Sequence, residues 1–220
     1  MSTEKKQPPA LDELTALSPI DGRYGSKTKT LRPLLSEHGL IKSRVTIEVL
    51  WVQKLISKLN LVDETELKVI HTKLKKIIVD FSKEAAKAVK SLERSTNHDV
   101  KAVEYYLREN FKKDRVLNQF IPYIHFGCTS EDINNLAYST MLKEARDRFI
   151  LPSLESLSNF LRLLANQFAT IGMLSRTHGQ PASPTTMGKE LANFVHRLEC
   201  QSSLLSQIQL KGKLNGAVGN

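Results

Sequence analysis

One polar break between two apolar, helix-like segments carries residues suited to acid–base chemistry. Residues 175–181 read SRTHGQP and place Thr177, His178 and Gln180 just before a proline that disfavours helix. An imidazole can donate or accept a proton near neutral pH, and Gly179 lets the backbone approach a ligand closely. The segment is a candidate catalytic loop, although a lone histidine in a surface loop remains the alternative.

A second break, with the sequence TNHD, is typical of a helix start. Asn97, His98 and Asp99 precede apolar residues at helical spacing. The positive end of a helix disfavours imidazolium, so a neutral His98 could exchange a proton there. A purely structural hydrogen-bonding role for His98 is the competing interpretation.

Two further breaks could bind anions. Thr129 and Ser130 open the sequence TSED, in which Asp132 completes a pattern like a capping box. Free backbone N–H groups and two hydroxyls at a helix N-terminus can bind carboxylate or phosphate. Arg23, beside Tyr24 in the sequence DGRY, could pair with an anion through its guanidinium. A plain helix start and a solvated arginine in a tight turn are the alternatives.

The elements that must position these residues are predicted to be helices. Apolar residues recur at alternating steps of three and four in the segments 45–59, 67–81, 150–168 and 187–208. No βαβ rhythm or strong alternation of period two is present, so the sequence predicts an all-α fold. Short extended pieces are expected around residues 15–25 and 170–185, and a domain boundary is expected near residues 118–128.

Composition narrows the possible functions of the 220-residue chain. Lys and Arg number 32 against 23 Asp and Glu, a net charge of +9. The sequence contains no RGG run, RNP motif or zinc finger, so we expect no nucleic-acid partner. It contains no P-loop, GxGxxG or HExxH motif and no apolar run of membrane-spanning length. Two cysteines without zinc-ligand spacing indicate a reducing compartment, and a cytoplasmic location is expected.

Five segments together resemble the adenylosuccinate lyase family of the fumarase/aspartase superfamily. They are SPIDGRYGSKT, ERSTNHDVKAVEYYL, IHFGCTSEDINNLA, MLSRTHGQPASPTTMGKELANF and KLNGAVGN. The resemblance extends from about residue 14 to residue 220, and the motifs occur in the family's order.

The resemblance implies an all-α homotetramer whose central bundle is built from long helices. On this basis we expect a mobile N-terminal tail over residues 1–14, a small helical N-terminal domain over 15–127 and the start of the bundle domain over 128–220. The implied reaction is β-elimination of fumarate from adenylosuccinate, giving AMP, and from the succinyl-carboxamide ribotide SAICAR, giving AICAR. The family implies no organic cofactor and no metal.

The resemblance also implies a role for each candidate residue. His178 would be the general acid that protonates the leaving nitrogen, and His98 would orient the substrate and support charge near the reaction centre. The residues implied to bind substrate are Arg23 and Tyr24 at the phosphate, Thr129 and Ser130 at a succinyl carboxylate, and Asn97, His98, Asp99, Thr177 and Gln180 elsewhere.

The sequence departs from the family in one respect. Family members continue beyond the segment matching residue 220 and place a serine base in an SSxMPxKxNP context, which this chain lacks. We therefore expect the chain to be a fragment of a longer enzyme, poorly active alone. The alternatives are another fumarate-releasing lyase, such as argininosuccinate lyase, or a non-catalytic helical fragment that oligomerises.

Overall fold

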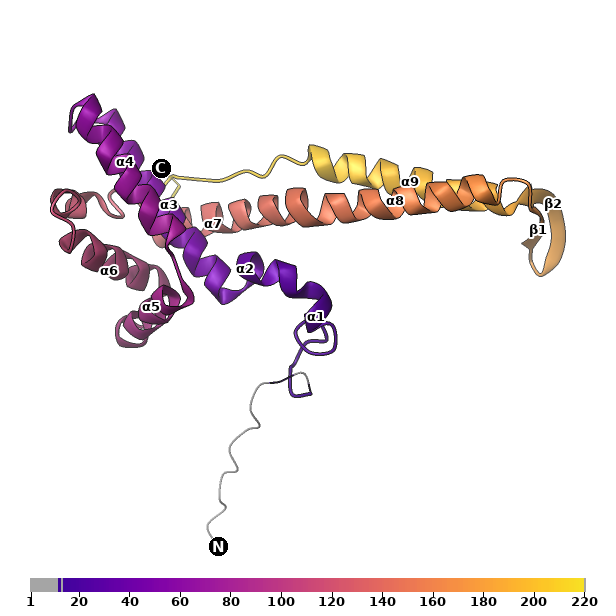
Figure 1. Ribbon diagram of the computed structural model, residues 1–220, viewed down its shortest axis with the longest axis horizontal. Helices are drawn as coiled ribbons and strands as arrows, with labels where there is room; N and C mark the ends of the chain where they lie inside the picture. The colour runs from indigo at the N-terminus through magenta and orange to yellow at the C-terminus, as the bar shows by residue number, and fades with distance from the viewer. Residues whose placement is uncertain (1–11, 13, 220) are drawn as a thin grey trace, which may run out of the picture.

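The computed structural model describes residue 12 and residues 14–219, so most of the expected tail over residues 1–14 lies outside the described residues. A group of shorter helices forms one end of the molecule, and a long two-helix arm extends from it (Figure 1). The elements of the first part are α1 Gly25–Thr28, η1 Lys29–Leu31, α2 Arg32–Leu35, α3 Glu37–Lys58, α4 Glu64–Val79, α5 Lys83–Thr96, α6 Asp99–Lys112 and η2 Asn118–Tyr123.

The core of this first part is built around α3. Its predicted apolar stripe is buried, with Val45, Val49, Val52 and Ile56 all fully inaccessible to solvent. Leu59 falls outside the core because α3 ends at Lys58. Side chains from α4, α5, α6 and η2 complete one continuous apolar cluster around the stripe.

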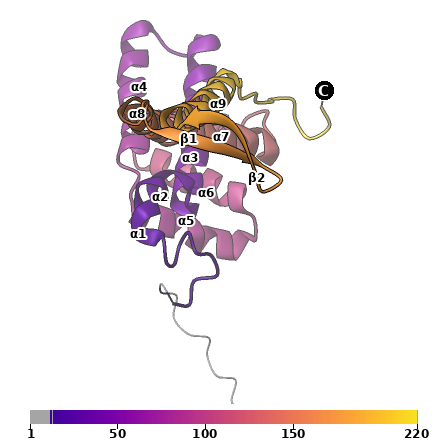
Figure 2. The same ribbon diagram turned by 90° about the vertical axis from the view of Figure 1, so that its right-hand side faces the viewer.

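The arm begins with α7 Ser130–Ala145, continues through the π-helical turn η3 Arg146–Ile150 and ends with α8 Leu151–Gln167. The chain then turns through the antiparallel strands β1 Gly172–Thr177 and β2 Gln180–Thr186 and returns as α9 Met187–Gln207. Viewed along the arm, α8 and α9 lie side by side with the hairpin nearest the viewer (Figure 2). The helical fold is confirmed.

The hairpin agrees with the extended piece expected around residues 170–185, but the one expected around 15–25 is wrong. There the backbone bonds locally, with Gly22 N–H donating to Ser18 O (2.9 Å) and Tyr24 N–H to Pro19 O (2.8 Å). These short-range bonds close consecutive turns, so the backbone here is not extended.

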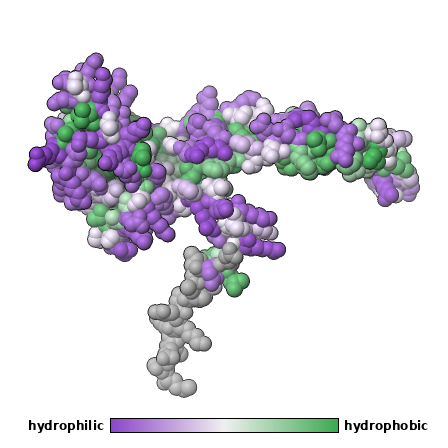
Figure 3. Space-filling model, in the orientation of Figure 1, coloured by the Kyte–Doolittle hydropathy of each residue, from purple (hydrophilic) through white to green (hydrophobic). Residues whose placement is uncertain are grey.

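The arm keeps much of its apolar surface exposed in the single chain. Hydrophobic side chains appear along it in the space-filling view (Figure 3). Those with about half their surface exposed include Leu157, Phe160, Leu163, Phe194 and Leu204. Leu157 and Phe194 belong to the predicted stripes, and Phe160, Leu163 and Leu204 lie outside them, so the contact between α8 and α9 covers only part of their apolar surface.

A buried group of charged side chains lies between α3, α6 and the loop before α7. Glu48 is fully buried and accepts hydrogen bonds from the backbone N–H of His125 (3.1 Å) and its ring Nδ1 (2.5 Å). Glu104 lies 3.7 Å from the other ring nitrogen of His125 and also pairs with Lys101 (2.9 Å). Burial alone would lower the pKa of His125, but the two carboxylates outweigh burial and raise it.

No helix among the described residues is both long enough and apolar enough to cross a lipid bilayer.

The first prediction concerns the start of α9, which packs against the end of α8. A Cβ on Gly188 would collide with the backbone oxygen of Ala165 in α8 and lie 2.6 Å from Ala169 Cα just after that helix, so Gly188→Ala must push the two helices apart. We expect the unfolding free energy of the chain to fall by roughly 1–3 kcal/mol in urea denaturation. Gly172→Ala is the control, because a Cβ there meets nothing within 4 Å; equal losses in both variants would contradict the packing explanation.

The second prediction concerns the Glu48–His125 pair. Because folding raises the pKa of His125, the pair's stabilisation is complete below the unfolded-state pKa, about 6.5, and declines as pH rises through the folded-state value. Glu48→Gln should therefore cost on the order of 1–3 kcal/mol near pH 6 and less near pH 9. Urea unfolding at both pH values measures this, with the exposed Glu155→Gln as control. A cost independent of pH would refute it.

Candidate functional site

The N-termini of α6 and α7 meet, and they bring two predicted site residues together. His98 is the N-cap of α6, and its ring Nδ1 accepts the backbone N–H of Lys101 (3.2 Å). In this arrangement the proton of the neutral ring sits on Nε2. That nitrogen lies 3.4 Å from the Ser130 hydroxyl at the start of α7. Both side chains are partly open to solvent, so an anion could contact the ring edge and the hydroxyl together.

The turn before α6 is fixed by a buried arginine. Asn97 adopts a left-handed backbone conformation (φ 49°) that ends α5, so Asp99 directly starts the next helix. Arg44 of α3 binds the Asp99 carboxylate (2.6 Å) and the side-chain oxygen of Asn134 in α7 (2.8 Å). Burial would raise the pKa of Asp99, but the Val100 N–H and the Arg44 guanidinium hold it below its ordinary value. One guanidinium thereby connects α3, α6 and α7.

The predicted capping box at α7 is present. Thr129 is the N-cap, and the side chain of Asp132 accepts its backbone N–H (2.9 Å). The capping box fixes the first turn of α7, from which the Ser130 hydroxyl lies next to His98. Cys128, just before them, is not suited to be a nucleophile, because burial raises the pKa of its thiol to about 12.

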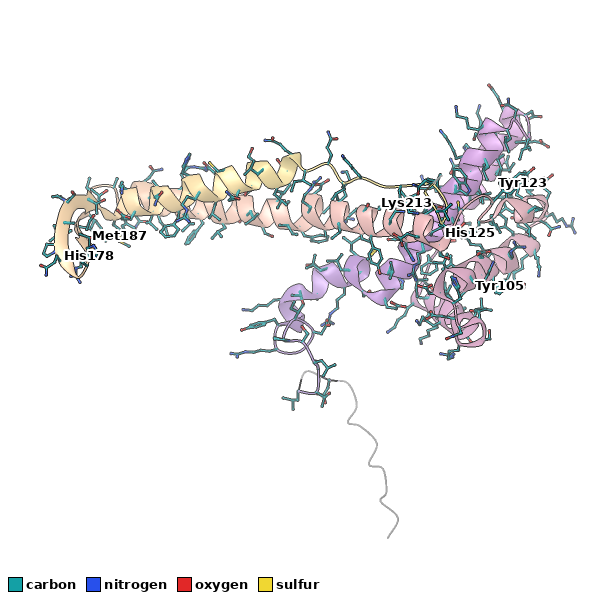
Figure 4. The ribbon with its side chains drawn as sticks, turned by 180° about the vertical axis from the view of Figure 1, so that it is seen from behind. Tyr105, Tyr123, His125, His178, Met187 and Lys213 are labelled. Carbon is teal, nitrogen blue, oxygen red and sulfur yellow. The ribbon has the colours of Figure 1, made fainter. Side chains whose placement is uncertain are left out.

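His178 lies at the tip of the β1–β2 hairpin, far from the meeting point of α6 and α7. Figure 4 shows it at one end of the arm and His125 and Lys213 at the other. Thr177 pairs with Gln180 across the turn, and His178 (φ 49°) and Gly179 (φ 74°) both have left-handed backbones. Two such residues make a type I′ turn, which a histidine adopts only at a cost. The side chains of the turn are exposed to solvent.

Arg23 and Tyr24 lie in the turns before α1, and α1 is separated from α6 and α7 in Figure 1. The Arg23 guanidinium lies 5.5 Å from the centre of the Tyr24 ring. The single chain therefore joins Asn97, His98, Asp99, Thr129 and Ser130 in one place. The DGRY turn and the residues of the THGQ hairpin lie in two other places, apart from this one.

Sequence reasoning missed the buried charges Arg44, Glu48 and Glu104 and the partly buried His125 that support this place. It assigned Asp132 only to the capping box. Arg44 and Glu48 could have been found, because each lies in α3 directly beside a residue of its buried apolar stripe. Within the described part of the chain, no group of three or more His, Cys, Asp or Glu side chains could hold a metal ion.

Comparison with known proteins places the chain in a family. A family model described as "Lyase" matches residues 22–220. The adenylosuccinate lyase of Haemophilus influenzae is 50% identical over 214 residues, which is 96% of this chain and 46% of the relative. That of Escherichia coli K12 is 49% identical over 211 residues, with the same coverage. The chain thus spans about half the length of the curated relatives it matches, and the resemblance stated from its motifs is confirmed.

Solved structures agree on the fold. A fumarate lyase from Mesorhizobium sp. BNC1 superposes with a TM-score of 0.68 at 21% identity, covering 86% of this chain and 42% of that one. The β-carboxy-cis,cis-muconate cycloisomerase of Acinetobacter calcoaceticus gives 0.66 at 20% identity, with 87% and 43% covered. With its helical architecture matched by these structures and residues 22–220 matched by the family model, the chain belongs to the lyase family.

Proposed function

We propose that this chain supplies part of an adenylosuccinate lyase, a C–N lyase of purine biosynthesis. It would eliminate fumarate from adenylosuccinate, leaving AMP, and from SAICAR, leaving AICAR. The observation that carries the proposal is the meeting of two helix N-termini, where the Ser130 hydroxyl and Nε2 of His98 lie 3.4 Å apart. Identity of about half to adenylosuccinate lyases over nearly the whole chain supports the choice of substrate.

The start of α7 fits one carboxylate of the succinyl group. The first turn of α7 and the Ser130 hydroxyl can donate hydrogen bonds to an anion, and the helix dipole favours an anion there. Removal of a proton β to the leaving nitrogen builds charge onto the neighbouring carboxylate. Donors already in place stabilise that charge as it develops, an effect worth a few kcal/mol in enzymes of this kind.

His98 is suited to orienting the substrate. Its Nδ1 is occupied by the Lys101 amide, so only Nε2 is available to a ligand. Arg44 holds Asp99, and the left-handed Asn97 sets the path of the chain into α6. The ring is thereby presented with a fixed edge toward Ser130, and Asn97 and Asp99 would complete the contacts.

His178 would protonate the nitrogen as the C–N bond breaks, while Thr177 and Gln180 hold the substrate beside it. Because the hairpin stands far from His98 in one chain, we propose that another copy brings its His178 to the site in a homotetramer. The exposed apolar faces of α8 and α9 support such an assembly. Arg23 and Tyr24 would bind the phosphate, again after assembly.

The remaining assignments follow from this reaction. The base that removes the carbon-bound proton is not assigned to a residue of this chain. Residues 15–127 would form the N-terminal domain, and residues 128–220 would open the domain that builds the central bundle. Two unpaired cysteines support a cytoplasmic location.

The third prediction tests the reaction and its acid together in the protein at its natural length. Wild type should release fumarate, measured by absorbance, from adenylosuccinate and SAICAR but not from argininosuccinate. His178→Asn keeps a residue that tolerates the left-handed turn and removes the imidazole. It should lower kcat by roughly 10²–10⁴-fold with a much smaller change in KM.

The exposed His196→Gln on α9 is the matched control and should retain activity. Absence of fumarate release by the folded wild type would contradict the proposed function. Near-normal turnover by His178→Asn would contradict only the assignment of His178 as the general acid.

The fourth prediction tests whether one site draws on two chains. His98→Gln and His178→Asn proteins, each expected to be inactive, are unfolded together and refolded as mixed oligomers. Some sites then combine an intact His98 from one chain with an intact His178 from another, so a measurable fraction of wild-type turnover should return. Mixing without unfolding is the control, and no recovery in verified hybrids would mean that both residues come from one chain.

A further inference from the structure

The segment after α9 runs back along α7 in an extended path toward the start of that helix (Figure 1). Side chains on one face of α7 bind its backbone. Ser139 donates to Lys211 O (2.9 Å), while the Asn135 side chain accepts Lys213 N–H (2.7 Å) and donates to Lys213 O (3.1 Å). Asn135 and Ser139 therefore fix the register of the extended segment against the helix.

Asp132, one turn closer to the helix start, makes the densest set of these bonds and is fully buried. Its Oδ1 accepts the ammonium of Lys213 and the backbone N–H of Asn215, each at 3.1 Å. Its Oδ2 accepts the backbone N–H of Thr129 (2.9 Å) and of Gly216 (3.2 Å). Four donors match the roughly four acceptor sites of a carboxylate, so the Asp132 carboxylate has no site left to accept a further hydrogen bond.

This arrangement requires the charged carboxylate. Burial would raise the pKa of Asp132, but the Thr129 N–H, the Lys213 ammonium and the Asn215 N–H outweigh burial and lower it. A buried ion is tolerated only when its partners are complete, and Lys213 supplies the single positive charge. An asparagine of the same shape would turn an NH₂ group toward two of the donors, so it cannot replace the aspartate.

We propose that Asp132 is a positioning residue that locks the Thr129–Ser130 turn to residues 213–216, so that the two segments form one rigid wall beside His98. One oxygen of Asp132, Oδ2, accepts the backbone N–H groups of both Thr129 and Gly216. Neither segment can therefore shift relative to the other without breaking a hydrogen bond to Asp132. Nothing in the proposed chemistry makes Asp132 touch the substrate. The expected effect of Asp132 on turnover rests on the proposed function, because it acts by placing Thr129 and Ser130. The connection between the two segments does not depend on that function.

A helix cap that served folding alone would behave differently. Losing it would reduce the fraction of folded protein and so lower the maximal rate, while the remaining folded molecules kept their KM. Losing a positioning residue displaces the substrate-binding donors in folded molecules, and KM changes too.

The fifth prediction is tested with Asp132→Asn in the protein at its natural length. We expect faster amide hydrogen exchange at Thr129, Asn215 and Gly216. With adenylosuccinate we expect kcat/KM to fall by about 10²-fold, with a clear rise in KM. Ser139→Ala is the matched control, since it releases Lys211 without touching the Asp132 bonds, and it should change exchange only near residue 211.

Lys213→Ala provides a second variant should Asp132→Asn fail to fold. It removes the ammonium both from Asp132 Oδ1 and from the backbone oxygen of Gly216, to which Lys213 also donates (2.9 Å). Exchange should therefore rise at Asn215 and Gly216, while Thr129 keeps its bond to Oδ2. Unchanged exchange at residues 215–216 in this variant would overturn the proposal, as would an unchanged KM in folded Asp132→Asn. If wild type releases no fumarate, the proposed function fails, and the exchange pattern still decides whether the lock exists.

Discussion

Two charged side chains one turn apart on α3 hold the site region together. Arg44 reaches Asp99 at the start of α6, and Glu48 reaches His125 in the loop before α7. Both emerge from the helix with the most completely buried apolar stripe, so their own positions are fixed by core packing. Burying such charges is costly unless every one is paired, and here the pairing partners are the two segments that carry the candidate binding groups.

This arrangement links the core to the site in a definite order. Apolar packing fixes the position of α3. The charged side chains of α3 fix the two loops that they bind, and these loops fix the positions of the N-termini of α6 and α7. Asp132 and Lys213 then add a later segment of the chain to the same place. The binding groups therefore rest on rigid elements, which favours preorganised donors over a site that forms around its ligand.

The helices could be predicted from the sequence because periodic apolar residues report directly on one buried face. The capping box at Thr129 and the helix start at His98 were also predictable, since cap chemistry depends on neighbouring residues. Arg44 and Glu48 stand out in the sequence beside an apolar stripe, but their roles were not assigned, because the partners of a buried charge, such as Asp99 and His125, lie far away in the sequence. The spatial separation of His178 from His98 was likewise invisible, since it depends on the length and direction of the arm.

The π-helical turn at η3 bears on how the apolar spacing of α7 continues into α8. An α-helix rotates by about 100° per residue, and a π turn takes up one additional residue within a single turn. Residues after η3 therefore have the orientation that they would have in a continuous α-helix one residue shorter. A step of five in the apolar spacing at this turn thus keeps the same side of the rod, which runs on from α7 into α8 (Figure 1). Deleting one residue within Arg146–Ile150 would let α7 and α8 join as a regular α-helix without changing the direction of the distal arm.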